Sequence, residues 1–400
     1  MATPLALTAA VGALALASTL AGCSTESGPA QPESSATSEQ PAAPVKSIND
    51  PLVLSYDGGL YVLDGETLAV ESDIPLPGFL RVNPAGDDGH VLISTGDGFR
   101  LLDAAAGELT ETVFAAAEPG HVVPHGERTA LFADGSGEIT VFDPHDLAEA
   151  NPETQTLTSP EPHHGVAVVL SDGSWVRSEG TPDGRSGAVA FDAEQREIAR
   201  NAECPGLHGE AVAEGEVVVL GCENGVLTYS DRVFTKIPAP GEYGRSGNLR
   251  GHADSPVVLG DFKIDPDAEL ERPNQVALID TVRNELRLVA LPESVSYSFR
   301  SLARGPHGAA LILGTDGNLY VVDPASGDTI RTIMVTAPWT EPDEWQQPRP
   351  TVFTRDHDVY VTDTATNEIH LVDVESGEVT ASATLPNTPN EVSGVVGHEH

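Results

Sequence analysis

The chain is short of basic residues. Its 400 residues include 21 Lys and Arg against 61 Asp and Glu, which gives a formal net charge of −40. The acidic residues are spread along the sequence, and a surface of this kind repels nucleic acid and anionic lipid head groups. We therefore expect no nucleic-acid partner and no electrostatic attachment to a membrane. The negative surface serves either to keep an exported protein soluble or to attract cations.

Motifs of common catalytic and metal sites are also missing. The sequence contains no Gly-x-Ser-x-Gly elbow, no vicinal cysteines and no Asp-rich calcium loop. It has only three Trp, too few to suggest a cofactor platform. Two of them, Trp339 and Trp345, lie in a Pro-rich insertion, which we interpret as a surface cover or as a lip on which a partner docks. These absences argue against an enzyme.

The N-terminal apolar run is too short to span a membrane. Residues 5–20 are rich in Ala, Leu, Val and Gly, as in a signal peptide, although no Lys or Arg precedes them. The run ends in Leu-Ala-Gly-Cys, which resembles a bacterial lipobox, a site where the cysteine, here Cys23, is lipidated and becomes the new N-terminus. The alternative is an ordinary signal sequence with a chance cysteine.

The next segment is too polar to fold. It is made largely of Ser, Thr, Pro, Ala, Gln and Glu, and such a segment buries too little apolar surface to offset the entropy of ordering. We predict a lipoprotein signal peptide at 1–22, a flexible tether at 23–49 and a folded domain at 50–400. The protein is then exported and held at the outer face of the cell membrane only by its N-terminal lipid.

A short pattern recurs along the folded domain, in which an apolar strand ends at Asp and a turn follows. The period is about 44 residues, within the range of propeller blades. Other short β-branched strands flank each copy, and no segment has sustained helical periodicity. We predict an all-β fold, a single β-propeller of eight four-stranded blades, with seven as the alternative. The copies end at Asp64, Asp103, Asp143, Asp192, Asp280, Asp323 and Asp373, with a degraded copy ending at Ser230.

The two ends of the domain complement each other. The first repeat begins at residues 52–54 without an opening strand, whereas the chain ends with a spare strand at 391–396. We predict that this C-terminal strand pairs into the first blade, because closure of that kind leaves no exposed sheet edge.

Ten of the 13 histidines stand at two recurrent places in the blades. One set lies where the innermost strands of blades three, four and five begin, and the other lies at the turns that leave the innermost strands. Innermost strands line the central channel of a propeller, so equivalent side chains of neighbouring blades converge there. The first set is His121, His163, His164 and His208, and the second is His125, His252, His307, His357, His398 and His400.

Three converging imidazoles, with a carboxylate or a water molecule, make a tetrahedral zinc site. We predict zinc ligation by His121, His164 and His208. His163 is the alternative to His164, because consecutive strand residues face opposite sides. The candidates for a completing carboxylate are Glu118, Glu161 and Asp254.

The remaining histidines are weaker candidates. His252, His307 and His357 are at least as well explained as solvated turn residues. The C-terminal pair, His398 and His400, forms either a short chelating motif or a loose tail. We expect structural or surface roles for His90, His145 and His370.

Two cysteines remain besides Cys23. Cys204 precedes the innermost strand of the fifth blade, and Cys222 ends the next strand, so antiparallel pairing would bring them together. In an exported protein such a pair favours a disulfide. Metal ligation by the two cysteines is the alternative.

The segments at 120–126, 162–167 and 204–211, together with Cys222, make the chain resemble the AztD-type zinc metallochaperones over essentially the whole propeller. The resemblance implies an exported protein that binds Zn²⁺ and hands it to the zinc-binding solute-binding protein of an ABC importer. It also implies a disulfide between the two cysteines, and the matching histidines are His121, His125, His164 and His208.

One departure concerns the N-terminal side. Members of that family often carry a His/Asp-rich tract near the mature N-terminus, whereas residues 24–49 contain no His. The C-terminal tail is the candidate to serve instead. We expect a monomer without enzymatic activity, and the alternatives are a metal-free interaction scaffold and a propeller enzyme.

Overall fold

The recurrent strand ends in Asp because the carboxylate holds the turn that follows. Asp103 Oδ1 accepts the backbone N–H of Ala106 at 2.8 Å, and Asp373 Oδ1 accepts that of Glu375 at 2.8 Å. Gly107 closes the first of these hairpins with a φ of 72°, a left-handed conformation that glycine adopts without strain. The same carboxylate-to-backbone bond is made by Asp64, Asp143, Asp192, Asp280 and Asp323.

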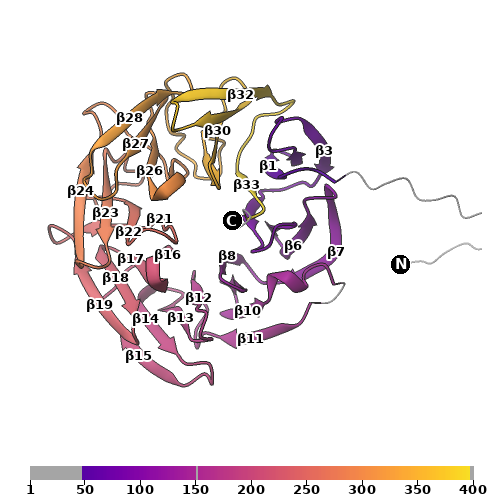
Figure 1. Cartoon of the computed structure of the whole chain (residues 1–400). Helices are drawn as coiled ribbons and strands as arrows, with labels where there is room; N and C mark the ends of the chain where they lie inside the picture. The colour runs from indigo at the N-terminus through magenta and orange to yellow at the C-terminus, as the bar shows by residue number, and fades with distance from the viewer. Residues whose placement is uncertain (1–46, 150–151, 397–400) are drawn as a thin grey trace, which may run out of the picture. The chain divides into compact units, whose positions relative to one another are not determined.

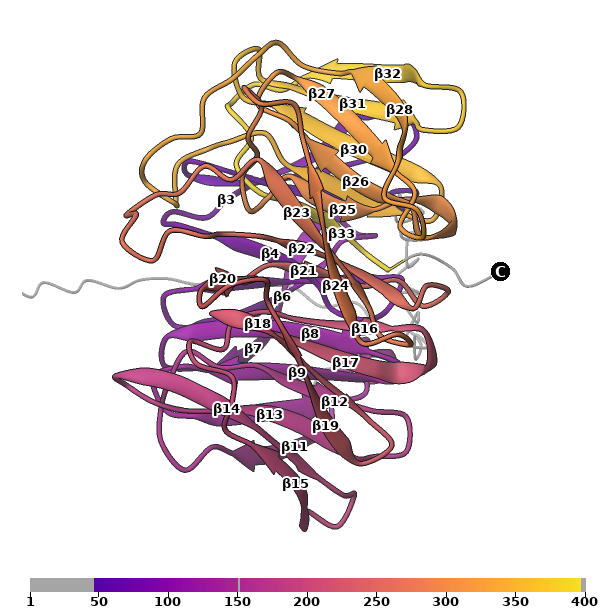
Figure 2. The same cartoon turned by 90° about the vertical axis from the view of Figure 1, so that its left-hand side faces the viewer.

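The computed structural model describes residues 47–149 and 152–396, which form eight antiparallel sheets arranged as the blades of a propeller (Figure 1). Figure 2 shows the same ring from the side. The predicted all-β propeller is confirmed, with eight blades rather than seven. Blades one to four consist, from the channel outward, of β33 (Val392–Gly394), β1 (Leu52–Tyr56), β2 (Gly59–Leu63) and β3 (Val70–Pro75); β4 (Arg81–Pro84), β5 (His90–Thr95), β6 (Gly98–Asp103) and β7 (Glu108–Ala115); β8 (Pro119–His125), β9 (Arg128–Ala133), β10 (Glu138–Phe142) and β11 (Thr154–Thr158); and β12 (Ala167–Val169), β13 (Trp175–Thr181), β14 (Gly184–Phe191) and β15 (Glu197–Asn201).

The other four blades follow in chain order. A short strand, β20 (Gly244–Arg245), pairs in parallel with the third strand of blade five, and three short 3₁₀ helices occupy turns: η1 (Pro144–Asp146), η2 (Glu214–Glu216) and η3 (Pro306–Gly308). Blades five to eight consist of β16 (Glu210–Ala213), β17 (Val217–Cys222), β18 (Asn224–Ser230) and β19 (Val233–Pro238); β21 (Leu249–Arg250), β22 (Val257–Asp261), β23 (Gln275–Asp280) and β24 (Glu285–Ala290); β25 (Leu302–Arg304), β26 (Ala310–Leu313), β27 (Asn318–Val322) and β28 (Thr329–Met334); and β29 (Val352–Arg355), β30 (Asp358–Asp363), β31 (Glu368–Asp373) and β32 (Glu378–Thr384).

The hydrophobic core lies between neighbouring blades. Val218 and Leu220 of β17 pack in one cluster with Val176 of blade four, whereas Val219 packs in another with Val258 of blade six. Successive side chains of a strand point to opposite faces, so one apolar strand supplies both clusters. The blades are therefore held to each other by the same residues that build them.

The C-terminal strand closes the ring, as predicted. β33 lies beside β1 at the inner edge of blade one (Figure 1) and pairs with it in antiparallel register, with Leu54 opposite Val392. The backbone N–H of Ser55 extends the pairing by donating to the carbonyl of Glu391 at 2.9 Å. The Glu391 carboxylate accepts a bond from Arg300 Nη2 at 2.7 Å, and both side chains are buried. The closing segment is thus tied to blade one by its backbone and to blade seven by an ion pair.

Several predicted features fall outside the described residues. They are the signal peptide at 1–22, Cys23, the tether except 47–49, and the pair His398 and His400. Those assignments, including the domain boundaries, stay predictions. In the part of the chain that the structure describes, no helix is long and apolar enough to cross a membrane.

Removing the acid of the closing segment should destabilise the fold strongly. Glu391→Ala leaves Arg300 buried without its counterion, and breaking a buried pair in this way costs about 3–5 kcal/mol. Urea unfolding of the domain should show this loss. Asp343→Ala breaks an exposed pair with Arg272 and should cost much less, so equal losses in the two variants would contradict the role given to Glu391.

Candidate metal centre

The backbone at the start of β8 directs His121 toward the channel. The pairing of β8 with β9 shifts register between Pro119 and Val122, and an irregularity of this kind re-aims a side chain. A Cβ at Gly120 would lie 2.1 Å from Asp134 Oδ1, so only glycine lets that carboxylate sit against the strand. The local sequence therefore places His121 and Asp134 at the same end of blade three.

The segment before β16 is positioned by the predicted disulfide, which is confirmed. Cys204 and Cys222 are joined, and both are buried in the core between blades four and five. The backbone N–H of His208 donates to the carbonyl of Gly221 at 3.0 Å. His208 is thereby held at the mouth of blade five before its strand begins.

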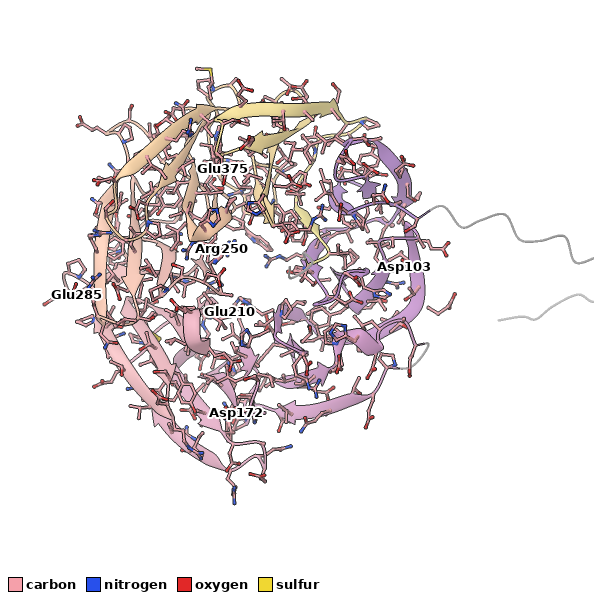
Figure 3. The ribbon with its side chains drawn as sticks, in the orientation of Figure 1. Asp103, Asp172, Glu210, Arg250, Glu285 and Glu375 are labelled. Atoms are coloured by element: carbon pink, nitrogen blue, oxygen red, sulfur yellow. A yellow bond between two sulfur atoms is a disulfide. The ribbon has the colours of Figure 1, made fainter. Side chains whose placement is uncertain are left out.

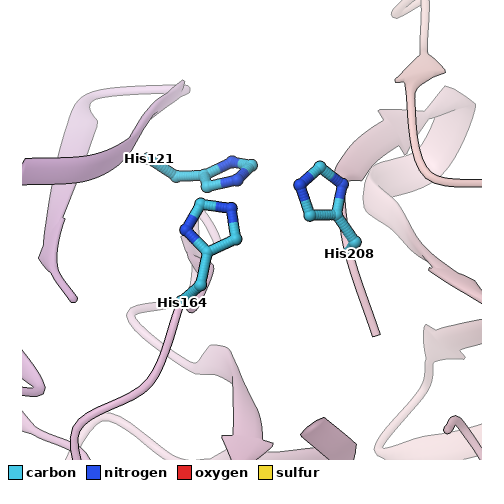
Figure 4. Close-up of side chains that lie close together, drawn as sticks. All are labelled: His121, His164 and His208. Atoms are coloured by element: carbon cyan, nitrogen blue, oxygen red, sulfur yellow. The ribbon is translucent and has the colours of Figure 1, made fainter. Parts of the chain in front are cut away.

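Three imidazoles from consecutive blades converge, as Figure 4 shows. The ring centroids of His121 and His164 are 5.0 Å apart, those of His164 and His208 are 5.1 Å apart, and those of His121 and His208 are 5.5 Å apart. One nitrogen from each ring lies within 4.8 Å of the other two. The three side chains, called the histidine trio below, are within reach of a single ion.

In each ring of the trio, Nδ1 faces a hydrogen-bond acceptor. Nδ1 of His164 lies 2.5 Å from Asp134 Oδ2, and Nδ1 of His208 lies 2.6 Å from the carbonyl oxygen of Gly247. The Glu210 carboxylate faces Nδ1 of His121 with its oxygens at 3.0 and 3.4 Å. A neutral ring whose Nδ1 carries the proton offers its Nε2 lone pair. This is the arrangement by which carboxylates and carbonyls orient metal-ligating histidines.

The surroundings set the protonation states of His208 and Glu210. Burial above all, and then the charge on His121, hold the pKa of His208 well below its ordinary value of 6.5. Burial alone would raise the pKa of the Glu210 carboxyl, but the charges of His121, Arg250 and His164 and a hydrogen bond from His121 together lower it. At neutral pH, His208 is therefore a neutral ligand and Glu210 is a carboxylate.

His163, the predicted alternative to His164, lies outside the trio. Its Nε2 contacts the Ser178 hydroxyl at 2.8 Å, its Nδ1 contacts the Glu161 carbonyl at 2.9 Å, and its ring packs against Phe132. Both of its nitrogens are thus engaged within the protein. His164, the next residue, lies in the same loop before β12 and projects into the trio instead.

His125 and His252 lie apart from the trio as well. His125 ends the strand that contains His121, and the rise over four residue steps of an extended strand separates them by roughly 13 Å. Its Nε2 lies 2.8 Å from Glu216 Oε1. With His252, these two residues line a separate cavity of about 540 Å³. The structure therefore brings together three of the predicted histidines and leaves these two at another place.

The acids that contact the trio were not among those predicted. They are Glu210 and Asp134 instead of Glu118, Glu161 or Asp254. Glu210 has a local signal, since it stands two residues after His208, at the first position of the innermost strand β16. Asp134 had none, because it follows β9 and reaches His164 only across the boundary between blades three and four.

A second group lies at turns of blades seven and eight. Its ligand atoms come from His307, His357 and Glu375 and lie within 4.8 Å of one another. All three side chains are exposed, and His307 Nε2 lies 3.6 Å from Glu375 Oε1. This group lacks the buried acceptors that orient the histidine trio, and we assign it no role.

The chain is similar to a zinc chaperone of known sequence and structure. No family model matches the chain. The chain is 26% identical over 307 residues to the zinc chaperone AztD of Citrobacter koseri, an alignment that covers 74% of this chain and 70% of that protein. The resemblance predicted from the histidine and cysteine segments is confirmed.

The solved structures agree on the fold. Apo AztD from Citrobacter koseri superposes with a TM-score of 0.74 at 22% identity, covering 86% of this chain and 96% of that one. A second structure of Citrobacter koseri AztD superposes with a TM-score of 0.73 at 22% identity, covering 88% of this chain and 99% of that one. The dihydro-heme d1 dehydrogenase NirN in complex with DHE superposes with a TM-score of 0.58 at 14% identity, covering 89% of this chain and 76% of that one. At these identities, the structural likeness shows the shared propeller alone.

The metal-free protein should lose stability as pH falls below 6.5, in part because of His208. The unfolded chain takes up a proton at this histidine below 6.5, whereas the folded chain resists it, so the free energy of unfolding falls by at most about 1.4 kcal/mol per pH unit. Urea unfolding measures the free energy of unfolding at about pH 7.5 and at about pH 5.5. The decrease between the two pH values should be smaller in His208→Gln than in the unmodified protein. The exposed control His145→Gln should show the same decrease in the free energy of unfolding as the unmodified protein. An equally large decrease in His208→Gln would contradict the lowered pKa of His208.

Proposed function

We propose that this protein is a zinc chaperone that binds Zn²⁺ through His121, His164 and His208 and hands it to the zinc-binding solute-binding protein of an ABC importer. The similarity to the zinc chaperone AztD supports the zinc cargo. The observation that carries the site assignment is the convergence of the three rings, each with Nδ1 against an acceptor. No enzymatic step is part of this proposal.

The ligand chemistry suits a carrier. Imidazole nitrogens bind zinc at about 2.0–2.1 Å, and a site with three protein ligands keeps a fourth position open. The trio also lines a cavity of about 730 Å³, which leaves room for a ligand from a receiving protein. Zinc would then leave stepwise, as partner residues replace the imidazoles one at a time. A closed four-cysteine site would hold the ion too firmly for such exchange.

The proposed location brings the carrier close to its receiver. The signal peptide at 1–22, lipidation of Cys23 and the tether at 23–49 would hold a monomeric propeller at the outer face of the cell membrane. A short lipid-anchored tether raises the local concentration of the carrier near a membrane importer. The lipobox-like Leu-Ala-Gly-Cys sequence supports this part of the proposal.

Loss of any ring of the trio should abolish tight zinc binding. His121→Ala, His164→Ala and His208→Ala should each weaken binding by at least ~100-fold, because even residues behind metal ligands contribute 10–100-fold. Equilibrium dialysis with metal analysis measures the bound zinc, and the exposed control His145→Ala should bind as the unmodified protein does. Unchanged stoichiometry in His121→Ala and His208→Ala would remove the site assignment and favour a metal-free scaffold.

Transfer should run through a complex with the receiver. Zinc-loaded protein mixed with the metal-free solute-binding protein should release zinc at a rate that saturates with receiver concentration. A small chelator of matched affinity should remove zinc more slowly, because it cannot dock and replace ligands in turn. Stopped-flow measurement of both rates decides the point, and equal rates for chelator and receiver would rule out direct transfer.

A further inference from the structure

The cavity beside the histidine trio has a basic wall. In a chain with only 21 Lys and Arg, six basic side chains line this one cavity, beside only three acidic ones, Glu210, Asp261 and Glu391. The concentration of positive charge contrasts with the acidic remainder of the protein. The basic residues are Arg81, Arg245, Arg250, Lys263, Arg300 and Arg304.

The three acids of the wall are already engaged. Glu391 pairs with Arg300 at 2.7 Å and with Arg81 at 3.4 Å. Asp261 Oδ1 accepts the backbone N–H groups of two loop residues at 2.6 and 2.9 Å. The third acid, Glu210, faces the ring of His121. Over residues 47–149 and 152–396, no acid forms an ion pair with Arg245, Arg250, Lys263 or Arg304.

Arg250 is the most constrained of these unpaired cations. Its Nε donates to the carbonyl of Leu302 at 3.0 Å and its Nη1 donates to the carbonyl of Leu249 at 2.8 Å. Burial lowers its pKa. Figure 3 shows Arg250 and Glu210 at the inner rim of the ring, whereas Glu285 lies at its outer edge. The charges of Glu210 and Asp261 oppose this lowering of the pKa, but the groups that contact the guanidinium are neutral carbonyls, and a buried charge that lacks an ion-pair partner is costly.

Arg245 stands directly beside the trio. Its Nε and the Nδ1 of His208 both lie within 3.5 Å of the point where a Cβ on Gly247 would be. Its backbone exchanges two hydrogen bonds of 2.9 Å with Lys263, a cross-strand pairing that places two side chains on one face. Arg245 therefore flanks His208, Lys263 lines the same cavity on the strand paired with it, and Arg250 interacts with Glu210.

A zinc ion at the trio would add to this positive charge. The Glu210 and Asp134 carboxylates face Nδ1 of two rings on the side away from Nε2. The neutral imidazoles, and a water molecule in the fourth position, would therefore bring no negative charge into contact with the ion. Like charges at close range in a partly buried site repel strongly. The cavity is of the size that binds small molecules, and carboxylates and other oxyanions are the natural partners of arginine.

We propose that this cavity binds a small carboxylate anion between Arg245, Arg250 and Lys263 and the open coordination position of zinc at the trio, so that anion and zinc bind cooperatively. The coordination of the anion to zinc rests on the proposed function, whereas binding of the anion by the basic residues does not depend on it. The anion occupies the fourth zinc position in place of water. By linkage, zinc tightens anion binding and the anion tightens zinc binding by the same factor.

Succinate tests the site, because it carries two carboxylates and is a weak zinc chelator. Calorimetric titration of the metal-free protein should show succinate binding, and Arg250→Gln should weaken it at least tenfold, as expected for loss of a charge-assisted hydrogen bond. Arg250→Lys should retain part of the affinity. The matched control Arg283→Gln removes an exposed arginine of an outer hairpin and should bind succinate normally, as thermal unfolding confirms that each variant is folded. Succinamide, of similar size but neutral, should not bind.

A second titration measures zinc affinity with and without succinate, at a free zinc level fixed by a metal buffer. Succinate should tighten zinc binding about tenfold in the unmodified protein and leave it unchanged in Arg250→Gln. Absence of succinate binding, or equal binding by Arg250→Gln, would overturn the anion site. Succinate binding that leaves the zinc affinity unchanged would overturn the cooperative arrangement. Succinate binding by a protein that does not bind zinc would defeat the proposed function and leave the anion site standing.

Discussion

Closure of the ring by β33 on β1 is the constraint on which the rest of the structure depends. Each histidine of the trio comes from a different blade, and no blade holds more than one of them. Their convergence depends on how neighbouring blades pack against each other, and the closure holds all eight blades in one ring. The ion pair of Glu391 with Arg300 joins the closing segment to blade seven and lines the same cavity as the trio. The residues that close the ring therefore also line the cavity beside the trio.

The site combines neutral ligands with fixed acceptors and a basic surrounding. Asp134, Glu210 and the carbonyl of Gly247 orient the rings, so little rotation has to be restrained when an ion binds. The disulfide adds a covalent restraint just before His208. The basic wall works against the binding of a bare cation. The oriented rings and the disulfide preorganise the geometry of the site, whereas the basic wall leaves the charge of a bound cation uncompensated. This combination suits the proposed zinc cargo, which has to be released again.

The features predicted from sequence are those encoded by short segments. The Asp-turn repeat marks each blade because one carboxylate caps one local hairpin, and the spare C-terminal strand predicts the closure because an unpaired edge is unfavourable. A position at or just before the start of an innermost strand is enough to select His121 and His208. It could not separate His163 from His164, since that choice depends on which of two adjacent residues faces the channel.

Features assembled from distant segments were beyond sequence reasoning. Asp134 meets His164 across a blade boundary, and Arg81, Arg250 and Arg300 reach the cavity from blades two, six and seven. Nothing in their local sequences marks them, because ordinary surface arginines look the same. The resemblance to the zinc metallochaperones includes His125 among the matching histidines, but the rise of the extended strand that it shares with His121 carries it away from the trio.

The central claim is that blades three, four and five hold one zinc ion through three imidazoles. X-ray absorption at the zinc edge of the loaded protein tests it most directly. The account predicts three imidazole nitrogens at about 2.0–2.1 Å, an oxygen in the fourth position and no sulfur. A spectrum with sulfur ligands, or with fewer than three imidazoles, would contradict it.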